Sequence, residues 1–131
     1  MTNTLNQNNN NVLIVEDEES NYELLKAMLR KRDVVVLWAQ TGLEAIKLCK
    51  QHEFRLILMD IKMPEMSGYD AMIKIREMGV GCPMIAQTAY ARLEDEERAL
   101  KMGFNAYVSK PIDRNRLMGF IDEYLSDVTG L

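Results

Sequence analysis

Polar residues follow four of the short apolar runs in this 131-residue chain. The first run leads into Glu16 and Asp17, a central run ends in Asp60, and later runs lead into Thr88 and Lys110. Any one of these residues could simply cap a helix or face solvent, so the inference depends on their coincidence. Three carboxylates in one crevice repel each other and raise each other's pKa unless a cation joins them. Mg²⁺ prefers a few carboxylates and a phosphate oxygen, so the set indicates phosphoryl transfer.

The elements that must position these residues follow a regular alternation. From Val12 onward, short apolar runs alternate with stretches of helical spacing, which is typical of βα units. The strands are expected at Val12–Glu16, Val34–Ala39, Leu56–Asp60, Met84–Gln87 and Ala106–Val108. Several are apolar without alternation, as parallel strands covered on both faces are. The fold class is therefore α/β, a doubly wound five-stranded parallel sheet with helices on both faces, which binds ligands beyond the carboxyl ends of its strands.

Helices are expected between the strands because apolar residues recur there at helical spacing. The apolar stripes contain Tyr22, Leu25, Met28 and Leu29, then Ala45, Leu48 and Cys49, then Met72 and Ile75, and finally Leu117, Phe120, Ile121, Tyr124 and Leu125. Ser20 to Glu23 and Thr41 to Glu44 match the capping box, which predicts two helix starts. The segment Arg92–Met102 has no obvious cap and is expected to end at Gly103.

The composition predicts one globular domain. The chain is 47% hydrophobic and 27% charged, as an ordinary folded domain is. Six asparagines among residues 1–11 predict a disordered tail or linker, with the domain spanning 12–131. The net charge of −4 disfavours a nucleic-acid partner, and the apolar runs are far shorter than the ~20 residues of a membrane span. Two separated cysteines, Cys49 and Cys82, favour a reduced, cytoplasmic setting.

Four motifs in order resemble the receiver domains of response regulators in two-component signalling. They are VLIVEDE at 12–18, LILMDIKMPEMSG at 56–68, AQTAYA at 86–91 and YVSKPI at 107–112. The match spans nearly everything after residue 11, and the last two motifs resemble receivers of hybrid histidine kinases in particular. The resemblance implies the flavodoxin-like strand order 2-1-3-4-5. It also implies a phosphorelay role, in which the domain takes a phosphoryl group from phosphohistidine.

The resemblance gives the acidic residues separate roles. Asp60 is the implied nucleophile, which forms an acyl phosphate. Asp17 and Asp60 would bind Mg²⁺ directly, Glu16 would act mostly through water, and the backbone carbonyl of Lys62 would complete the protein ligands. Glu16 stands where aspartate is commoner in the family, so the resemblance leaves the metal affinity open at that position.

The resemblance also implies how the domain switches. Lys110 and the Thr88 hydroxyl would each pair with a phosphate oxygen, and the bond from Lys110 to Pro111 would be cis. Tyr107 would be the switch aromatic, whose ring turns inward when Thr88 moves toward the phosphate. Apart from the resemblance, a trans proline ending a strand and an ordinary half-buried tyrosine fit the same residues.

The surface that switching would remodel is residues 92–126. The implied partners are a histidine kinase or a histidine phosphotransfer domain, and the 92–126 face is also a candidate for homodimer contacts. We expect a signalling switch that catalyses its own phosphorylation and slow dephosphorylation, with output through a partner. Stand-alone regulator and receiver of a hybrid kinase both fit the sequence.

Two alternatives differ in function. Hydrolases of the haloacid dehalogenase type also use a strand-end aspartate with Mg²⁺, but they need a second aspartate two residues later, where this chain has Lys62. A receiver-like interaction module without phosphorylation is disfavoured because Asp17, Asp60, Thr88 and Lys110 are all present.

Overall fold

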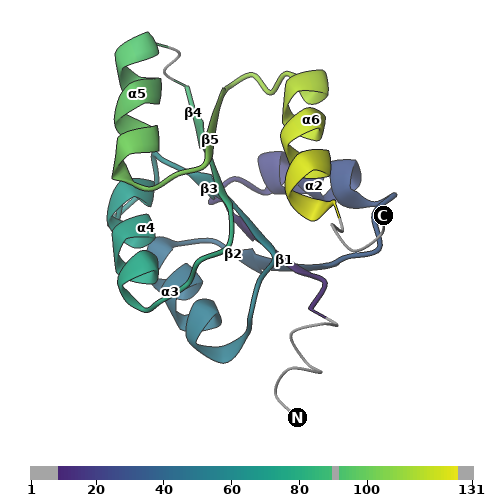
Figure 1. Ribbon diagram of the computed structural model, residues 1–131, viewed down its shortest axis with the longest axis horizontal. Coiled ribbons are helices and arrows are strands. Elements are labelled where there is room, and N and C mark those ends of the chain that lie inside the picture. Colours follow the sequence, from purple (N-terminus) through teal and green to yellow (C-terminus); the bar gives the residue numbers. More distant parts are fainter. Residues whose placement is uncertain (1–8, 90–91, 127–131) are drawn as a thin grey trace.

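The computed structural model describes residues 9–89 and 92–126, arranged as in Figure 1. The strands are β1 (Asn11–Val15), β2 (Val35–Ala39), β3 (Leu56–Asp60), β4 (Met84–Thr88) and β5 (Ala106–Ser109). The helices are α2 (Glu19–Leu29), α3 (Gly42–Gln51), α4 (Gly68–Glu77), α5 (Leu93–Met102) and α6 (Arg114–Leu125). Every predicted strand is present. Most of the predicted tail, residues 1–8, lies outside the described residues, so its disorder there stays a prediction. The predicted boundary is wrong at Asn11, which is the first residue of β1 and pairs with Val35 of β2.

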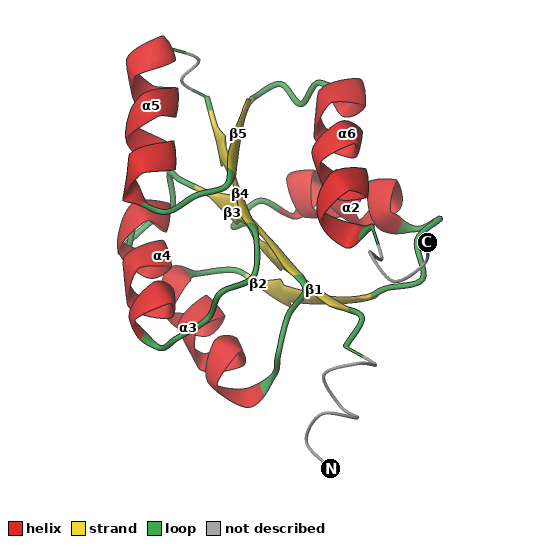
Figure 2. Ribbon diagram, viewed as in Figure 1, coloured by secondary structure: helices red, strands yellow, loops and turns green. Residues whose placement is uncertain are grey.

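The strands form one parallel sheet in the order β2-β1-β3-β4-β5. This confirms the predicted doubly wound, flavodoxin-like α/β fold. Figure 2 shows α3, α4 and α5 on one face of the sheet and α2 and α6 on the other. The winding reverses between β1 and β3, which is where such sheets open a crevice for a ligand.

Two hydrophobic cores, one on each face, explain the apolar strands. In β3, Ile57 and Met59 belong to the core beneath α3, α4 and α5, and Leu58 belongs to the core beneath α2 and α6. Every residue of β3 and β4 is buried, which is why these strands lack alternation. Because side chains alternate along a strand, Asp60 continues the row of Leu58 toward the α2 and α6 side.

Helix starts agree with the sequence at α3 but not at α2. The Thr41 hydroxyl accepts a hydrogen bond from the Glu44 amide at 3.1 Å, and the Glu44 carboxylate accepts one from the Gln40 amide at 2.7 Å. The capping box predicted at Ser20 is wrong, because α2 begins at Glu19 with Glu18 as its N-cap. The sequence pattern failed there because the Glu16 carboxylate accepts a hydrogen bond from the Glu18 amide, just before the helix.

Two further helices have side-chain caps that were not predicted from the sequence. Ser67 accepts a hydrogen bond from the Asp70 amide at the start of α4, and Asp113 accepts one from the Arg116 amide at the start of α6. As expected, α5 has no side-chain cap and ends at Gly103, whose φ of 134° favours glycine. These caps fix where the loops between strand and helix end.

Candidate functional site

Three carboxylates meet at the carboxyl end of the sheet. Glu16 directly follows β1, and Asp60 ends β3, its neighbour in the sheet. Ligand oxygens of Glu16, Asp17 and Asp60 all lie within 4.8 Å of one another. Glu16 and Asp60 are buried, and Asp17 is exposed. The three acids that the sequence predicted to converge therefore do so, and hard oxygen donors this close suit a divalent cation such as Mg²⁺.

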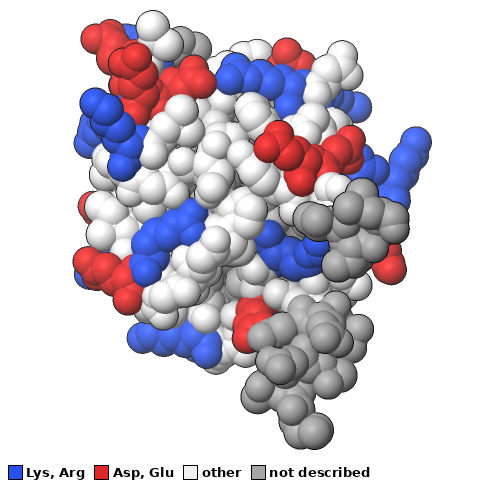
Figure 3. Space-filling view, viewed as in Figure 1, with Lys and Arg blue, Asp and Glu red and all other residues white. Residues whose placement is uncertain are grey.

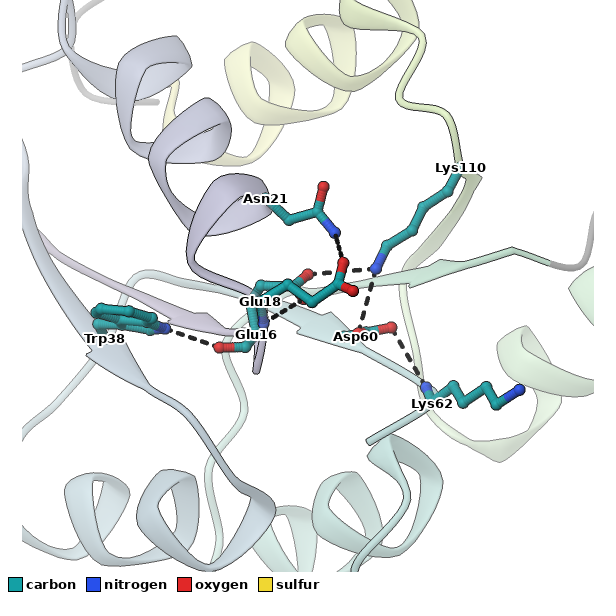
Figure 4. A network of polar contacts seen from close by, with 7 residues as sticks. All are labelled: Glu16, Glu18, Asn21, Trp38, Asp60, Lys62 and Lys110. Atoms are coloured by element: carbon teal, nitrogen blue, oxygen red, sulfur yellow. Dashed lines mark hydrogen bonds and ion pairs between the residues drawn. The ribbon is translucent and has the colours of Figure 1, made fainter. Parts of the chain in front are cut away.

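Lys110 reaches this acidic cluster from the end of β5. Its Nζ lies 3.2 Å from Asp60 Oδ2 and 3.3 Å from Glu16 Oε1. Figure 4 draws both contacts as dashed lines. The Lys110 amide donates to the Thr88 carbonyl at 2.6 Å, and the peptide bond from Lys110 to Pro111 is cis. One ammonium group thus bridges two buried carboxylates.

The ionisation of the cluster is shifted by burial and by mutual repulsion. Burial raises the pKa of Glu16 to about 7, Asp60 repels it further, and Lys110 partly offsets both effects. Burial also raises the pKa of Asp60, although Lys110 opposes this. Burial lowers the pKa of Lys110, but attraction to Asp60 and Glu16 outweighs it and the net shift is upward. The cluster has more negative charge than one ammonium neutralises, so it favours an added cation.

We expect the affinity for Mg²⁺ to rise as the pH rises through about 7. The raised pKa of Glu16 means that much of this carboxyl is protonated and uncharged below that pH. A bound cation favours the charged form, so binding near neutral pH should release a proton. Calorimetric titration with Mg²⁺ at about pH 6, 7 and 8 measures this. Equal affinities at all three values, or a Glu16→Gln variant with the same pH dependence as wild type, would contradict it.

The loop after β3 folds closely over Asp60. The Lys62 amide donates to Asp60 Oδ1 at 3.3 Å, and the Gly68 amide donates to the Ile61 carbonyl at 2.7 Å. A Cβ at Gly68 would lie 2.3 Å from the backbone oxygen of Asp60, so only glycine allows this approach. An open cleft here is lined by residues that include Asp17, Asp60, Lys62, Met63, Pro64 and Lys110.

Thr88 and Tyr107 are also brought together, on the neighbouring strands β4 and β5. Both are buried, and Tyr107 is 4% exposed. Burial and the nearby Asp95 raise the pKa of the Tyr107 hydroxyl, while a hydrogen bond with Thr88 lowers it. The ring that was expected to turn inward on activation therefore already lies inside the protein in this structure.

Gln87 is a buried polar residue that the sequence motifs did not single out. It lies beside Asp60 in the sheet register and is fully buried. Its side chain continues the row of Ile85 toward the core beneath α2 and α6. Among the residues that the structure describes, it is the one with buried side-chain nitrogen and oxygen atoms that lack a hydrogen-bond partner. An unpaired buried amide lowers stability.

Replacing Gln87 with methionine should therefore stabilise the metal-free protein. Methionine has a similar length without polar atoms, so we expect the free energy of unfolding to rise by about 1–2 kcal/mol. Urea denaturation measures this, and Gln51→Met, at an exposed position of α3, is the matched control, with a change of less than about 0.5 kcal/mol. A loss of stability in Gln87→Met would show that the amide has hydrogen-bonding partners in solution.

Comparison with known proteins decides the family. The response regulator receiver domain profile matches residues 12–122. The chain belongs to the response regulator receiver domain family. The polar-differentiation response regulator DivK of Brucella abortus is 41% identical to this receiver domain over 118 residues, which are 88% of this chain and 96% of DivK.

Two solved receiver structures resemble this receiver domain closely. The receiver domain of the Pseudomonas aeruginosa sensor histidine kinase PA1611, with a magnesium ion in its active-site cleft, has 33% identity and a TM-score of 0.78 over 91% of this chain and 99% of that one. The Saccharomyces cerevisiae Ssk1 receiver, solved with the phosphotransfer protein Ypd1, has 32% identity and a TM-score of 0.81 over 88% of both chains.

These matches confirm the family and fold that the motifs predicted. The likeness to the PA1611 receiver, which belongs to a sensor histidine kinase, supports in part the predicted resemblance to hybrid-kinase receivers. In residues 9–89 and 92–126, no helix is long and apolar enough to cross a membrane.

Proposed function

We propose that this receiver domain accepts a phosphoryl group on Asp60 from a phosphohistidine donor and uses Mg²⁺ to do so. The main support for this function is the environment of the Asp60 carboxylate. One of its oxygens contacts the Lys110 ammonium and the other accepts from the Lys62 amide, at the wall of an open cleft. Phosphoryl transfer requires fixed hydrogen-bond donors around the nucleophile, because they stabilise the negative charge on the phosphoryl group during transfer.

Mg²⁺ fits the donors present here. Asp17 and Asp60 would hold the ion directly, the backbone carbonyl of Lys62 would add a ligand, and Glu16 would act through water. The bound ion would neutralise charge on the phosphoryl oxygens. The PA1611 receiver, with magnesium in its cleft, and the close oxygens of the three acids support this assignment.

The proposed step is an in-line displacement. An oxygen of the Asp60 carboxylate forms a bond to phosphorus while the bond between phosphorus and the donor's imidazole nitrogen breaks. The electron pair of that bond stays on the nitrogen, and the donor leaves as neutral histidine because the other ring nitrogen of the phosphohistidine carries a proton. The Lys110 ammonium would leave the carboxylates of Glu16 and Asp60 and bind a phosphoryl oxygen. The Thr88 hydroxyl would donate a hydrogen bond to another phosphoryl oxygen. Hydrolysis of the acyl phosphate by water, assisted by the same residues, would reset the switch slowly.

The donor would be a histidine kinase or a histidine phosphotransfer domain. The Ssk1 receiver, solved with the phosphotransfer protein Ypd1, supports this class of partner. The test mixes this receiver with a phosphorylated histidine phosphotransfer domain and follows loss of phosphate from the donor, with EDTA as the control. Transfer in Mg²⁺ and none in EDTA is expected. Failure with a panel of donors and with acetyl phosphate would favour an interaction module without phosphorylation.

We assign the domain to residues 12–131 in a cytoplasmic protein without a nucleic-acid partner. The net charge of −4 supports the last point, as do interspersed acidic and basic side chains on the face in Figure 3. Two of the ion pairs join surface side chains, because Arg32 pairs with Asp122, and Arg116 pairs with Glu96 at 3.6 Å. A homodimer through the 92–126 face also belongs to the proposal.

Thr88→Ala tests the proposed switch. Phosphorylation can shift the equilibrium between two conformations of the domain only to the extent that the phosphoryl group interacts more favourably with one of them. A Thr88 hydroxyl that turns to the phosphoryl group would give up its hydrogen bond with Tyr107 and change the 92–126 face. The variant should still accept phosphate, but amide chemical shifts along α6 should respond less to beryllofluoride and Mg²⁺. Equal shifts in variant and wild type would remove Thr88 from the switch.

A further inference from the structure

Trp38 binds the backbone of Glu16, although no motif drew attention to it. It lies on the edge strand β2, and it is the one tryptophan of the chain. Its indole Nε1–H donates to the backbone carbonyl of Glu16 at 2.8 Å, a contact drawn in Figure 4. The Glu16 amide donates to the Ala39 carbonyl at 3.0 Å. Both backbone polar groups of Glu16 are thus tied to β2, one by the strand and one by a side chain.

The indole ring has a fixed orientation. It stacks on the Tyr22 ring of α2 with a centroid distance of 4.0 Å and an interplanar angle of 4°. Tyr22 is buried, and the Lys26 ammonium lies 5.8 Å from the centre of its ring. Stacking of this kind restricts rotation of the ring, so the N–H group is held toward Glu16.

The Glu16 side chain is held at both oxygens. Oε2 accepts from the Glu18 amide at 3.1 Å, and Oε1 lies 3.3 Å from Lys110 Nζ. Lys110 also holds Asp60, so a shift of the Glu16 backbone would displace the ammonium that contacts the proposed nucleophile. The contact of Trp38 with the Glu16 backbone therefore affects the positions of the other charged groups in the acidic cluster.

The geometry points to Trp38 as a positioning residue for Glu16, which sets the affinity of the acidic cluster for Mg²⁺ from the edge of the sheet. This inference rests on the proposed Mg²⁺ site. Groups that orient metal-binding side chains commonly change affinity by 10- to 100-fold, roughly, when they are removed. Trp38 acts through one further residue, so its effect should be smaller.

Trp38→Phe removes the N–H group and keeps a ring for the stack on Tyr22. We expect calorimetric titration at about pH 8, where Glu16 is charged, to show Mg²⁺ binding about 3- to 10-fold weaker than wild type. Tyr124→Phe is the matched control. It removes a hydroxyl that donates to the Asn105 carbonyl at 3.1 Å, just before β5 and away from the acids. Both variants lose one aromatic donor to a backbone carbonyl.

The outcomes separate the two proposals. Weaker Mg²⁺ binding in Trp38→Phe alone supports the positioning role, even if urea denaturation shows that both variants are destabilised equally. Unchanged Mg²⁺ affinity in Trp38→Phe overturns that role and leaves the proposed function in place. Absence of Mg²⁺ binding in the wild type overturns both.

The NMR signal of the indole N–H group gives a second test, which uses only the wild-type protein. A chain with one tryptophan gives one indole N–H cross-peak in a ¹⁵N-correlated spectrum. We expect that peak to move when Mg²⁺ is added to the wild type. A peak that stays in place while calorimetry shows binding would overturn the positioning role.

Discussion

Replacing Asp60 with asparagine should abolish phosphorylation of this receiver domain. An amide is too poor a nucleophile to displace the donor's imidazole, whereas the change in shape is very small. The fold should survive, because the variant removes a buried carboxyl whose pKa burial raises, and with it a cost of ionisation. Incubation with radiolabelled acetyl phosphate or a labelled phosphohistidine donor, followed by gel separation, measures the incorporation.

The control for this substitution is Asp33→Asn, at an exposed position just before β2, at the end of the sheet opposite the acidic cluster. It makes the same chemical change and should be labelled like wild type. Circular dichroism and urea denaturation should place all three proteins in the folded state before labelling. Labelling of Asp60→Asn at the wild-type level would mean that another residue accepts the phosphoryl group.

Replacing Asp17 with asparagine should weaken Mg²⁺ binding by about 10- to 30-fold. Even at about 4 Å, farther than a direct ligand lies, a carboxylate contributes roughly 2 kcal/mol to holding a divalent ion in a watery environment. Asp17 is exposed, so this watery value applies to it. Phosphorylation should slow at low Mg²⁺ and recover as Mg²⁺ is raised, because the nucleophile is intact. Calorimetric titration measures the affinity, and the phosphorylation rate at several Mg²⁺ concentrations measures the recovery.

Glu18→Gln is the matched control for Asp17→Asn. It removes the same charge from the same loop, and Glu18 lines the cleft but is not part of the acidic cluster. We expect it to change the affinity less than about threefold, as a partly screened neighbouring charge does. Equal losses in the two variants would mean that net charge, and not a direct ligand, explains the Mg²⁺ effect.

The sequence predicted the fold well because both of its main signals are local. Apolar runs such as Leu56–Asp60 and the helical stripes between them depend on burial, which each segment encodes by itself. The sheet order then follows from few topological options and from the resemblance. The polar residues at strand ends converge, as predicted, because parallel strands bring their carboxyl ends to one edge.

What the sequence did not predict depends on neighbours that are distant in the chain. Ser20 has the pattern of a cap, but the Glu16 carboxylate binds the Glu18 amide and the helix starts earlier. The Trp38 contact with Glu16 needs the pairing of β1 and β2 and the approach of α2. Gln87 looked like an ordinary strand residue, and only the sheet register places it beside Asp60.

Arg76 is another case in which spacing gave no signal. Its guanidinium donates to the carbonyls of Gly103, Val80 and Cys82 at 2.9, 3.0 and 2.7 Å, and to the Asn105 side chain at 2.9 Å. These partners come from two loops at the end of the sheet opposite the acidic cluster. A single arginine in a helix pattern is usually an exposed residue, so this set of contacts could be found only after folding placed both loops around it.

Chemical mapping of the modified residue tests whether Asp60 carries the phosphoryl group. Borohydride reduces an aspartyl phosphate to homoserine, which tandem mass spectrometry locates in the peptide. After phosphorylation with Mg²⁺, we predict homoserine at the position of Asp60 in wild type, and none after treatment in EDTA. Homoserine at Asp17 or another acid, or a stable phosphate on His52 with an unmodified Asp60, would show that Asp60 is not the phosphoacceptor.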